Sequence, residues 1–186
     1  MNVGSAQRPK VGERVCGDAF VVLTSGSKTT IALADGLGHG PMAAEAGHAF
    51  CTFVAEHRDD ALTDIIKGVH AQLRTTRGAV GAILRIDTES RAMQYVGVGN
   101  IDLVALSKAP IRPVSRPGVL GRRLGKVLKF DFILSEGDLL VFFSDGISSR
   151  FDAKRYRNLE LDKMAEAILR EHGKQYDDAT CIVVKC

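Results

Sequence analysis

Four aspartate-containing turns, each beside a strand-like run, constrain the fold of this chain more than any other feature. They are Cys16-Gly17-Asp18, Ala34-Asp35-Gly36, Ser144-Asp145-Gly146 and Asp177-Asp178. Carboxylates at strand ends can meet at one edge of a sheet although they lie far apart in the chain. Because like charges repel and are costly to desolvate, such a group needs cations between its members. Oxygen ligands favour Mg²⁺ or Mn²⁺, so the pattern predicts a metal-dependent hydrolase that acts on phosphate esters.

Composition is that of an ordinary globular protein. With 186 residues, 45% of them hydrophobic and 25% charged, the chain can bury a sizeable core, and we expect one domain over residues 1–186. The net charge of +3 gives no indication of nucleic-acid binding. Residues 1–12 lack the apolar core of a signal peptide, and the apolar runs are too short to span a membrane. The four cysteines form no CxxC pair, so we expect reduced thiols in a cytoplasmic protein, without a disulfide framework or a zinc site.

Hydrophobic patterning predicts strands with helices inserted early and late in the chain. One helix is expected from Pro41 to about His57, a second after an Asp59 or Asp60 N-cap, and a third from about 161 to Gly173. Runs 80–86, 92–98 and 101–106 predict a meander of antiparallel hairpins, and runs 130–134 and 139–143 flank a further hairpin turn at 136–138. The pattern therefore predicts α+β layers rather than a doubly wound parallel sheet.

The ordered motif set resembles a known family. Together with Ala34-Asp35-Gly36-Leu37-Gly38-His39-Gly40-Pro41, the aspartate motifs look like the SpoIIE-type branch of the metal-dependent protein phosphatases, the protein phosphatase 2C superfamily. The similarity runs from about residue 17 to 184. Within that branch, 15–18 and 97–101 are most like the stressosome feedback phosphatases. The resemblance implies a four-layer α-β-β-α sandwich, in which two antiparallel sheets are flanked by helices and a two-metal site lies at one end.

The resemblance also implies roles for the aspartates, with two Mn²⁺ or Mg²⁺ ions as cofactors. Asp35 would bridge the two ions, and Asp35 and Asp18 are the residues we expect to be catalytic. The remaining metal ligands would be the Gly36 carbonyl, Asp145 and the Asp177-Asp178 pair, in which Asp177 matches the family ligand and Asp178 supports it. Two divalent ions can activate a shared water near neutral pH for in-line attack on phosphorus. No nucleophilic side chain is needed, so we interpret Cys16 as a packed residue.

Two further residues are candidates for substrate phosphate. Arg14 precedes Asp18 and offers a guanidinium fork that suits a phosphate dianion, although a surface-loop role is the alternative. His39 lies in the glycine loop at 36–40, where it can act as a general acid or pack the loop. That loop does not match a dinucleotide or P-loop motif, which disfavours a nucleotide site.

Between Lys108 and Asp131 the chain carries basic residues and no acidic one. We interpret this stretch as a solvated loop or as a surface that docks a negatively charged phosphoprotein. By resemblance, the substrate would be a phosphorylated STAS-domain protein of a bacterial stressosome, and the enzyme would act as a monomer without nucleic-acid or membrane partners. The alternative from another class is a non-catalytic phosphoprotein-binding module with a phosphatase fold.

Overall fold

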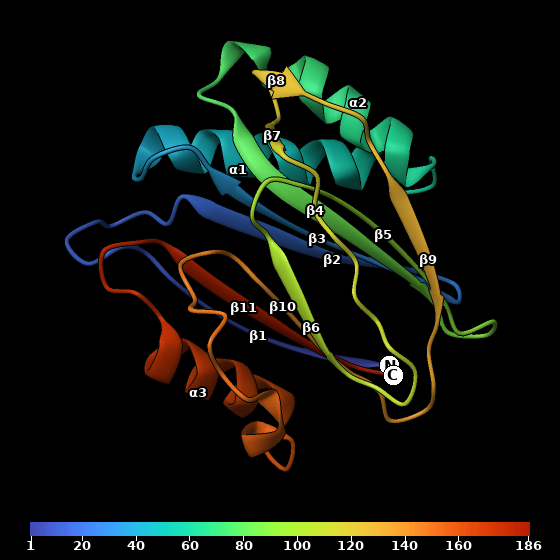
Figure 1. Cartoon of the computed structure of the whole chain (residues 1–186). Helices are drawn as coiled ribbons and strands as arrows, with labels where there is room; N and C mark the ends of the chain where they lie inside the picture. The colour runs from blue at the N-terminus through green and yellow to red at the C-terminus, as the bar shows by residue number, and fades with distance from the viewer.

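Two antiparallel sheets lie face to face in the computed structural model, which describes all residues 1–186 (Figure 1). One sheet, here called the terminal sheet, has the strand order β1 (Asn2–Arg8), β11 (Ala179–Lys185), β10 (Leu139–Phe143) and β6 (Asp102–Leu106). The other, here called the central sheet, has the order β2 (Asp18–Ser25), β3 (Lys28–Gly36), β4 (Ala79–Asp87), β5 (Ala92–Val98) and β9 (Lys129–Ile133). All pairings within both sheets are antiparallel, as predicted.

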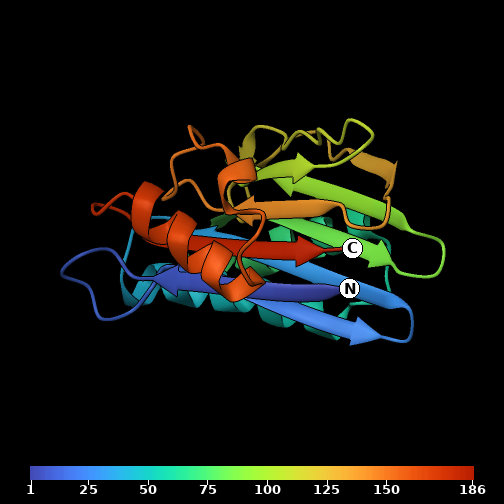
Figure 2. The ribbon, with the colours of Figure 1, turned by 90° about the horizontal axis from the view of Figure 1, so that it is seen from below.

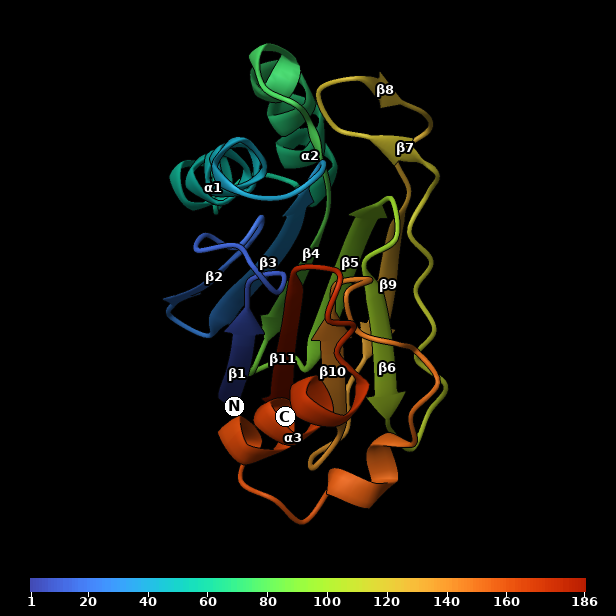
Figure 3. The same cartoon turned by 90° about the vertical axis from the view of Figure 1, so that its left-hand side faces the viewer.

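Helices cover both outer faces of this sandwich (Figures 1 and 3). Helices α1 (Pro41–Glu56) and α2 (Leu62–Gln72) pack on the central sheet, and α3 (Leu161–His172) packs on the terminal sheet. The short 3₁₀ helices η1 (Leu73–Thr75) and η2 (Ala153–Tyr156) and a small β7 (Gly118–Val119) to β8 (Arg123–Leu124) hairpin complete the elements. The predicted α-β-β-α layering is confirmed. None of the helices is long and apolar enough to cross a membrane.

Side chains of the central strands alternate between two buried environments. On β3, Ile31 and Leu33 enter the core between the sheets, whereas Ala32 and Ala34 face the helices. On β10, Phe142 likewise faces the core between the sheets, where it meets Tyr95 edge to face. Successive side chains of a strand point to opposite faces, so a strand covered on both sides is apolar at every position. This explains the unbroken apolar runs in the sequence.

Two predicted hairpins are wrong because the chain changes sheets at their turns. β4 and β5 pair as expected, but β6 pairs with β10 in the terminal sheet and not with β5. β9 pairs with β5, so the turn at 136–138 also leads from one sheet to the other. Turn residues show where a chain reverses, but burial decides which sheet the next strand joins.

Two local features also differ from the sequence analysis, one a wrong prediction and the other a strand that was missed. Neither Asp59 nor Asp60 caps α2; Ala61 occupies the N-cap without a side-chain bond, and the Asp60 carboxylate lies 3.0 Å from Nδ1 of His57. Strand β1 was not predicted, because Asn2–Arg8 is polar and only partly buried. It is an edge strand that pairs with β11 alone, and such strands have a weak apolar pattern.

We predict that Phe142→Ala lowers the free energy of unfolding by about 3–5 kcal/mol, because a large ring is removed from the core between the sheets. Urea unfolding followed by circular dichroism measures the change. Ile133→Ala is the matched control, since that side chain is 66% exposed and its loss is expected to cost below about 0.5 kcal/mol. Equal losses for both variants would contradict the assigned core.

Candidate functional site

The four aspartate motifs meet at one end of the sandwich. Asp18 opens β2 and lies directly opposite Asp35 near the end of β3. Asp145 follows β10, and the Asp177-Asp178 pair precedes the neighbouring strand β11. Figures 1 and 2 show that the N and C termini lie together at the opposite end. The predicted convergence of these carboxylates therefore holds, and it draws on both sheets.

The carboxylate of Asp18 connects the two sheets. Its side chain is 2% exposed, and Oδ2 accepts hydrogen bonds from Ser144 Oγ at 2.6 Å and Thr180 Oγ1 at 2.7 Å. Ser144 Oγ in turn accepts from the Thr180 backbone N–H at 3.0 Å. The other oxygen, Oδ1, is buried without a hydrogen-bond partner. A buried carboxylate with an unpaired oxygen is costly unless a cation or proton satisfies it.

Glycines next to the aspartates allow the backbone segments to approach closely. A Cβ on Gly36 would overlap the carbonyl oxygen of Ala43 in the first turn of α1. A Cβ on Gly146 would overlap the carbonyl oxygen of Asp178. The Asp-Gly order at both sites is therefore required sterically, since any larger residue would push helix or strand away from the aspartates.

Burial and mutual repulsion perturb the carboxylates at this end. Burial raises the pKa of Asp35 to about 8, and the negative charges of Asp18, Asp145 and Asp177 add to the shift. Burial likewise raises the pKa of Asp18 to about 7, against the opposing effect of the Ser144 and Thr180 hydroxyls. The pKa of Asp145 is raised by burial and by Asp177. Each charge therefore destabilises the others, as expected where cations belong.

The two residues of the Asp177-Asp178 pair have different environments. Asp178 is 2% exposed, its Oδ1 accepts from the Lys10 N–H at 2.9 Å, and its Oδ2 is buried without a partner beside Gly17. Asp177 is half-buried, and its charge raises the pKa of both Asp35 and Asp145. The charge of Asp178 likewise raises the pKa of Asp18 and Asp35, and its bond to the Lys10 N–H also fixes the loop between β1 and β2.

The donor set fits hard divalent cations. All of its candidate ligands are oxygens, two of the carboxylates carry buried unpaired oxygens, and burial and mutual repulsion raise the pKa of Asp35 and Asp18. No group of three or more His, Cys, Asp or Glu side chains is already drawn together as a ligand cluster.

Asn100 and Lys174 belong to this end of the molecule although sequence reasoning did not assign them. Asn100 Nδ2 donates to Asp145 Oδ2 at 2.6 Å, and Lys174 Nζ donates to the Asp145 backbone carbonyl. Asn100 lies in the turn that joins β5 of the central sheet to β6 of the terminal sheet. Its position near Asp145 therefore depends on this change of sheet. The hydroxyls of Ser144 and Thr180 were also missed, although both stand next to aspartate motifs in the sequence.

The two candidates for substrate phosphate lie in loops at the edge of this end. Arg14 is exposed and makes no hydrogen bond or ion pair. His39 Nδ1 lies 2.6 Å from Oε1 of Glu13, a pairing between the loop after β1 and the glycine loop that the sequence did not indicate. Cys16 donates from Sγ to the Arg8 carbonyl at 3.3 Å, and burial raises the pKa of its thiol to about 12. A thiol so hard to ionise is a poor nucleophile, in agreement with the packed role expected for it.

Comparison with known proteins identifies the family. Residues 25–186 match the family model described as stage II sporulation protein E (SpoIIE), a match that begins after Asp18. The phosphoserine phosphatase RsbX of Bacillus subtilis (strain 168) is 28% identical over 144 residues, which are 76% of this chain and 72% of RsbX.

Solved structures agree with that match. A chain from the structural study of the bacterial stressosome, described as a modular system adapted to control secondary messenger signalling, is 34% identical with a TM-score of 0.94, and 97% of each chain is covered. RsbX in complex with magnesium is 24% identical with a TM-score of 0.86, covering 96% of this chain and 92% of that chain.

Fold and similarity together define a protein serine/threonine phosphatase with the protein phosphatase 2C fold. Within this class, the chain belongs to the SpoIIE family.

We predict that the metal-free chain loses stability as the pH rises from about 4 to about 8. The folded-state pKa values of Asp18 and Asp35 lie above the unfolded value of 3.8, so in this range the folded chain binds more protons than the unfolded chain. Asp35→Asn removes one of these groups. Its advantage in unfolding free energy over the native chain should be larger at pH 8 than at pH 5, by on the order of 1–3 kcal/mol.

Urea unfolding in EDTA at both pH values measures this difference. Asp59→Asn is the control, because the Asp59 side chain is 81% exposed. This substitution should leave the native pH dependence of stability intact. An Asp35→Asn variant that loses stability between pH 5 and pH 8 as steeply as the native chain would contradict the assigned environment of Asp35.

Proposed function

We propose that residues 1–186 form one phosphatase domain that hydrolyses phosphoserine or phosphothreonine in proteins with the help of two Mn²⁺ or Mg²⁺ ions. The observation that carries the proposal is the gathering of aspartates from both sheets at one end of the sandwich, where burial and mutual repulsion raise the pKa of Asp18 and Asp35 to about 7 and 8. Magnesium in the RsbX structure and the activity named for that relative support it.

The proposed ligands are Asp18, Asp35, the Gly36 carbonyl, Asp145 and Asp177. Bound divalent ions would supply an activated water and offset the charge that develops on the phosphoryl oxygens. We assign the bridging position to Asp35, because it alone carries charge effects from Asp18, Asp145, Asp177 and Asp178. Asp178 is buried against Lys10 and Gly17, so we assign it a supporting role.

Neighbouring residues would hold these ligands in a fixed orientation. The Ser144 and Thr180 hydroxyls both donate to Asp18 Oδ2, which leaves Oδ1 free. Asn100 fixes Asp145 Oδ2. Near neutral pH, the carboxyl groups of Asp18 and Asp35 are partly protonated in the metal-free chain. Cation binding would release those protons. Such supporting contacts fix the rotamers of ligands and raise the affinity of metal sites.

We infer that the physiological substrate is a phosphorylated STAS-domain protein of a stressosome. Support comes from the 34% identical chain of the stressosome study, which matches over 97% of both chains, and from the similarity to RsbX. The reaction would remove the phosphate from a serine or threonine of that partner and so reset its signalling state.

We predict that the native chain hydrolyses para-nitrophenyl phosphate with Mn²⁺ or Mg²⁺ and that EDTA abolishes the turnover. Asp35→Asn should reduce kcat/KM about a thousandfold, because loss of the bridging ligand removes several kcal/mol of charge stabilisation. Release of nitrophenolate measures the rate, and Asp59→Asn serves as control.

Turnover that survives Asp35→Asn would refute the bridging assignment. A folded native chain that turns over neither para-nitrophenyl phosphate nor a phosphorylated STAS-domain protein with any metal would instead indicate a phosphoprotein-binding module.

We predict that Asn100→Ala raises the Mg²⁺ concentration needed for half-maximal activity about tenfold, because Asp145 loses its hydrogen-bond donor. Metal titrations of para-nitrophenyl phosphate hydrolysis measure the shift. Asn158→Ala, at an exposed site near α3, is the matched control. An unchanged half-maximal concentration for Asn100→Ala would remove Asn100 from the metal site.

A further inference from the structure

Exposed basic side chains lie along the loop that joins β6 to β9. This loop runs beside the edge strands of both sheets (Figure 3). We call five of its exposed basic residues the basic strip; they are Arg112, Arg116, Arg122, Arg123 and Lys126. No Asp or Glu occurs between Lys108 and Asp131, so the segment itself does not neutralise this charge.

Most side chains of the strip have no partner within the molecule. Some basic residues elsewhere on the surface pair with nearby acids, as Lys67 does with Asp64 at 2.9 Å. In the strip, the side chains of Arg116, Arg123 and Lys126 make no ion pair or hydrogen bond, and the first pairing beyond it is that of Lys129 with Asp131. The charges of the strip are therefore available to an external anion.

The loop that carries the strip is held in a defined position. Ile111 and Leu120 are buried, and β7 and β8 form a small hairpin. Arg122 differs from its neighbours, because its Nε and Nη2 donate to the carbonyls of Arg77 and Thr76 at 3.2 and 2.9 Å. Arg122 thus anchors the loop, while Arg123 presents its charge to the solvent.

Backbone contacts connect this loop to both halves of the aspartate site. Arg116 exchanges backbone hydrogen bonds with Gly97 and Gly99, at 2.8 and 2.9 Å. The residue after Gly99 is Asn100, which donates to Asp145 of the terminal-sheet half.

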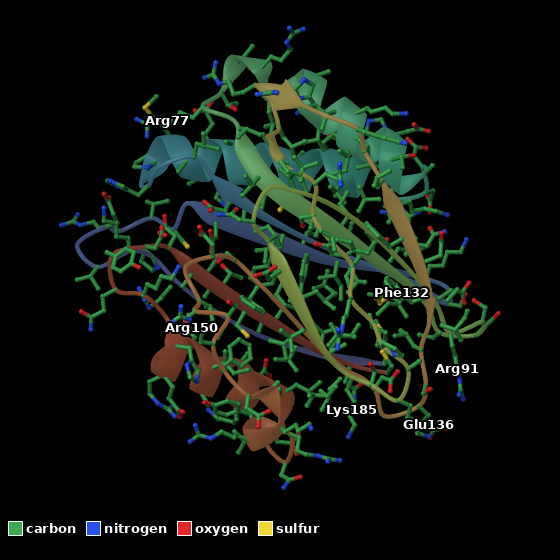
Figure 4. All side chains as sticks on the ribbon, in the orientation of Figure 1. Arg77, Arg91, Phe132, Glu136, Arg150 and Lys185 are labelled. Atoms are coloured by element: carbon green, nitrogen blue, oxygen red, sulfur yellow. The ribbon has the colours of Figure 1, made fainter.

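On the central-sheet side, Leu120 exchanges backbone bonds with Ala79 at 2.8 and 3.1 Å, and the preceding Gly78 carbonyl accepts from the Leu37 N–H at 3.0 Å. Leu37 follows the Asp35-Gly36 motif directly. Arg77, whose guanidinium lies beside Gly38 of the glycine loop, extends the positive charge toward that half (Figure 4).

We propose that the basic strip docks an acidic surface of the phosphorylated protein substrate, next to its phosphoserine; the inference rests on the proposed function. The aspartates alone would repel an acidic partner, whereas an adjacent positive strip offsets this repulsion and steers the approach. An acidic protein fits better than nucleic acid, because residues 112–126 contain no aromatic side chain on which bases could stack.

Two synthetic phosphoserine peptides test the proposal, one flanked by Asp and Glu and one flanked by Gly and Asn, with para-nitrophenyl phosphate as a third substrate. At low salt, native kcat/KM on the acidic peptide should exceed that on the neutral peptide about tenfold. Arg123→Gln with Lys126→Gln should remove most of this preference, and the loss on para-nitrophenyl phosphate should be far smaller. High salt should also remove the preference, because screening weakens exposed charges.

A matched control is Arg157→Gln with Lys185→Gln, which removes the same charge from two exposed sites outside the strip. Figure 4 places Lys185 toward the termini, away from Arg77. Equal activity of the native chain on both peptides, or an equal loss in the control variant, would overturn docking by the strip.

Binding in EDTA separates failure of docking from failure of catalysis. The acidic peptide, labelled with a fluorophore, should bind the native chain and lose about tenfold in affinity in the Arg123→Gln, Lys126→Gln variant, even if no substrate is turned over. Unchanged affinity would overturn the proposal. Displacement of the peptide by a single-stranded DNA of about 20 nucleotides, with tighter binding of that DNA, would assign the strip to nucleic acid instead.

Discussion

The hydrogen bonds that Asp18 accepts from Ser144 and Thr180 join the two sheets at the end that carries the aspartates. Farther along the sandwich, large apolar side chains such as Phe142 and Leu33 fill the space between the sheets. At this end a buried carboxylate with one unpaired oxygen takes their place. An apolar core stabilises the fold unconditionally, whereas this polar contact depends on protonation or on a cation. The contact between the sheets is therefore conditional at this end and unconditional farther along.

Most elements of the fold could be predicted because their hydrophobic periodicity is strong. The helices at 41–56, 62–72 and 161–172 and the buried strands follow directly from that pattern. The partner strands of β6 and of β9, which are β10 and β5, could not be predicted. A turn sequence does not specify whether the next strand returns to the same sheet. Strand β1 escaped notice since an edge strand buries too little to impose an alternating pattern.

In the candidate site, too, features with a local sequence signal could be predicted and those that depend on tertiary packing could not. The aspartates could be placed from sequence because each adjoins a strand with a clear signal, and the strand ends bring them together. Asn100 and Glu13 act through contacts between loops, which depend on how the sheets are stacked. Hydroxyl residues such as Ser144 and Thr180 are common in any sequence, and only burial against Asp18 gives them significance.

The position of β11 between β1 and β10 has a consequence for folding. β1 comprises residues 2–8, yet its only partner is the strand at 179–185. Pairing across almost the whole chain carries a large loop-closure cost, and topologies with such distant contacts fold slowly. During synthesis, β1 and β10 would keep open edges until the last strand emerges, and Asp177 and Asp178 arrive just ahead of it. A nascent chain therefore completes its aspartate site in the same step that closes the terminal sheet.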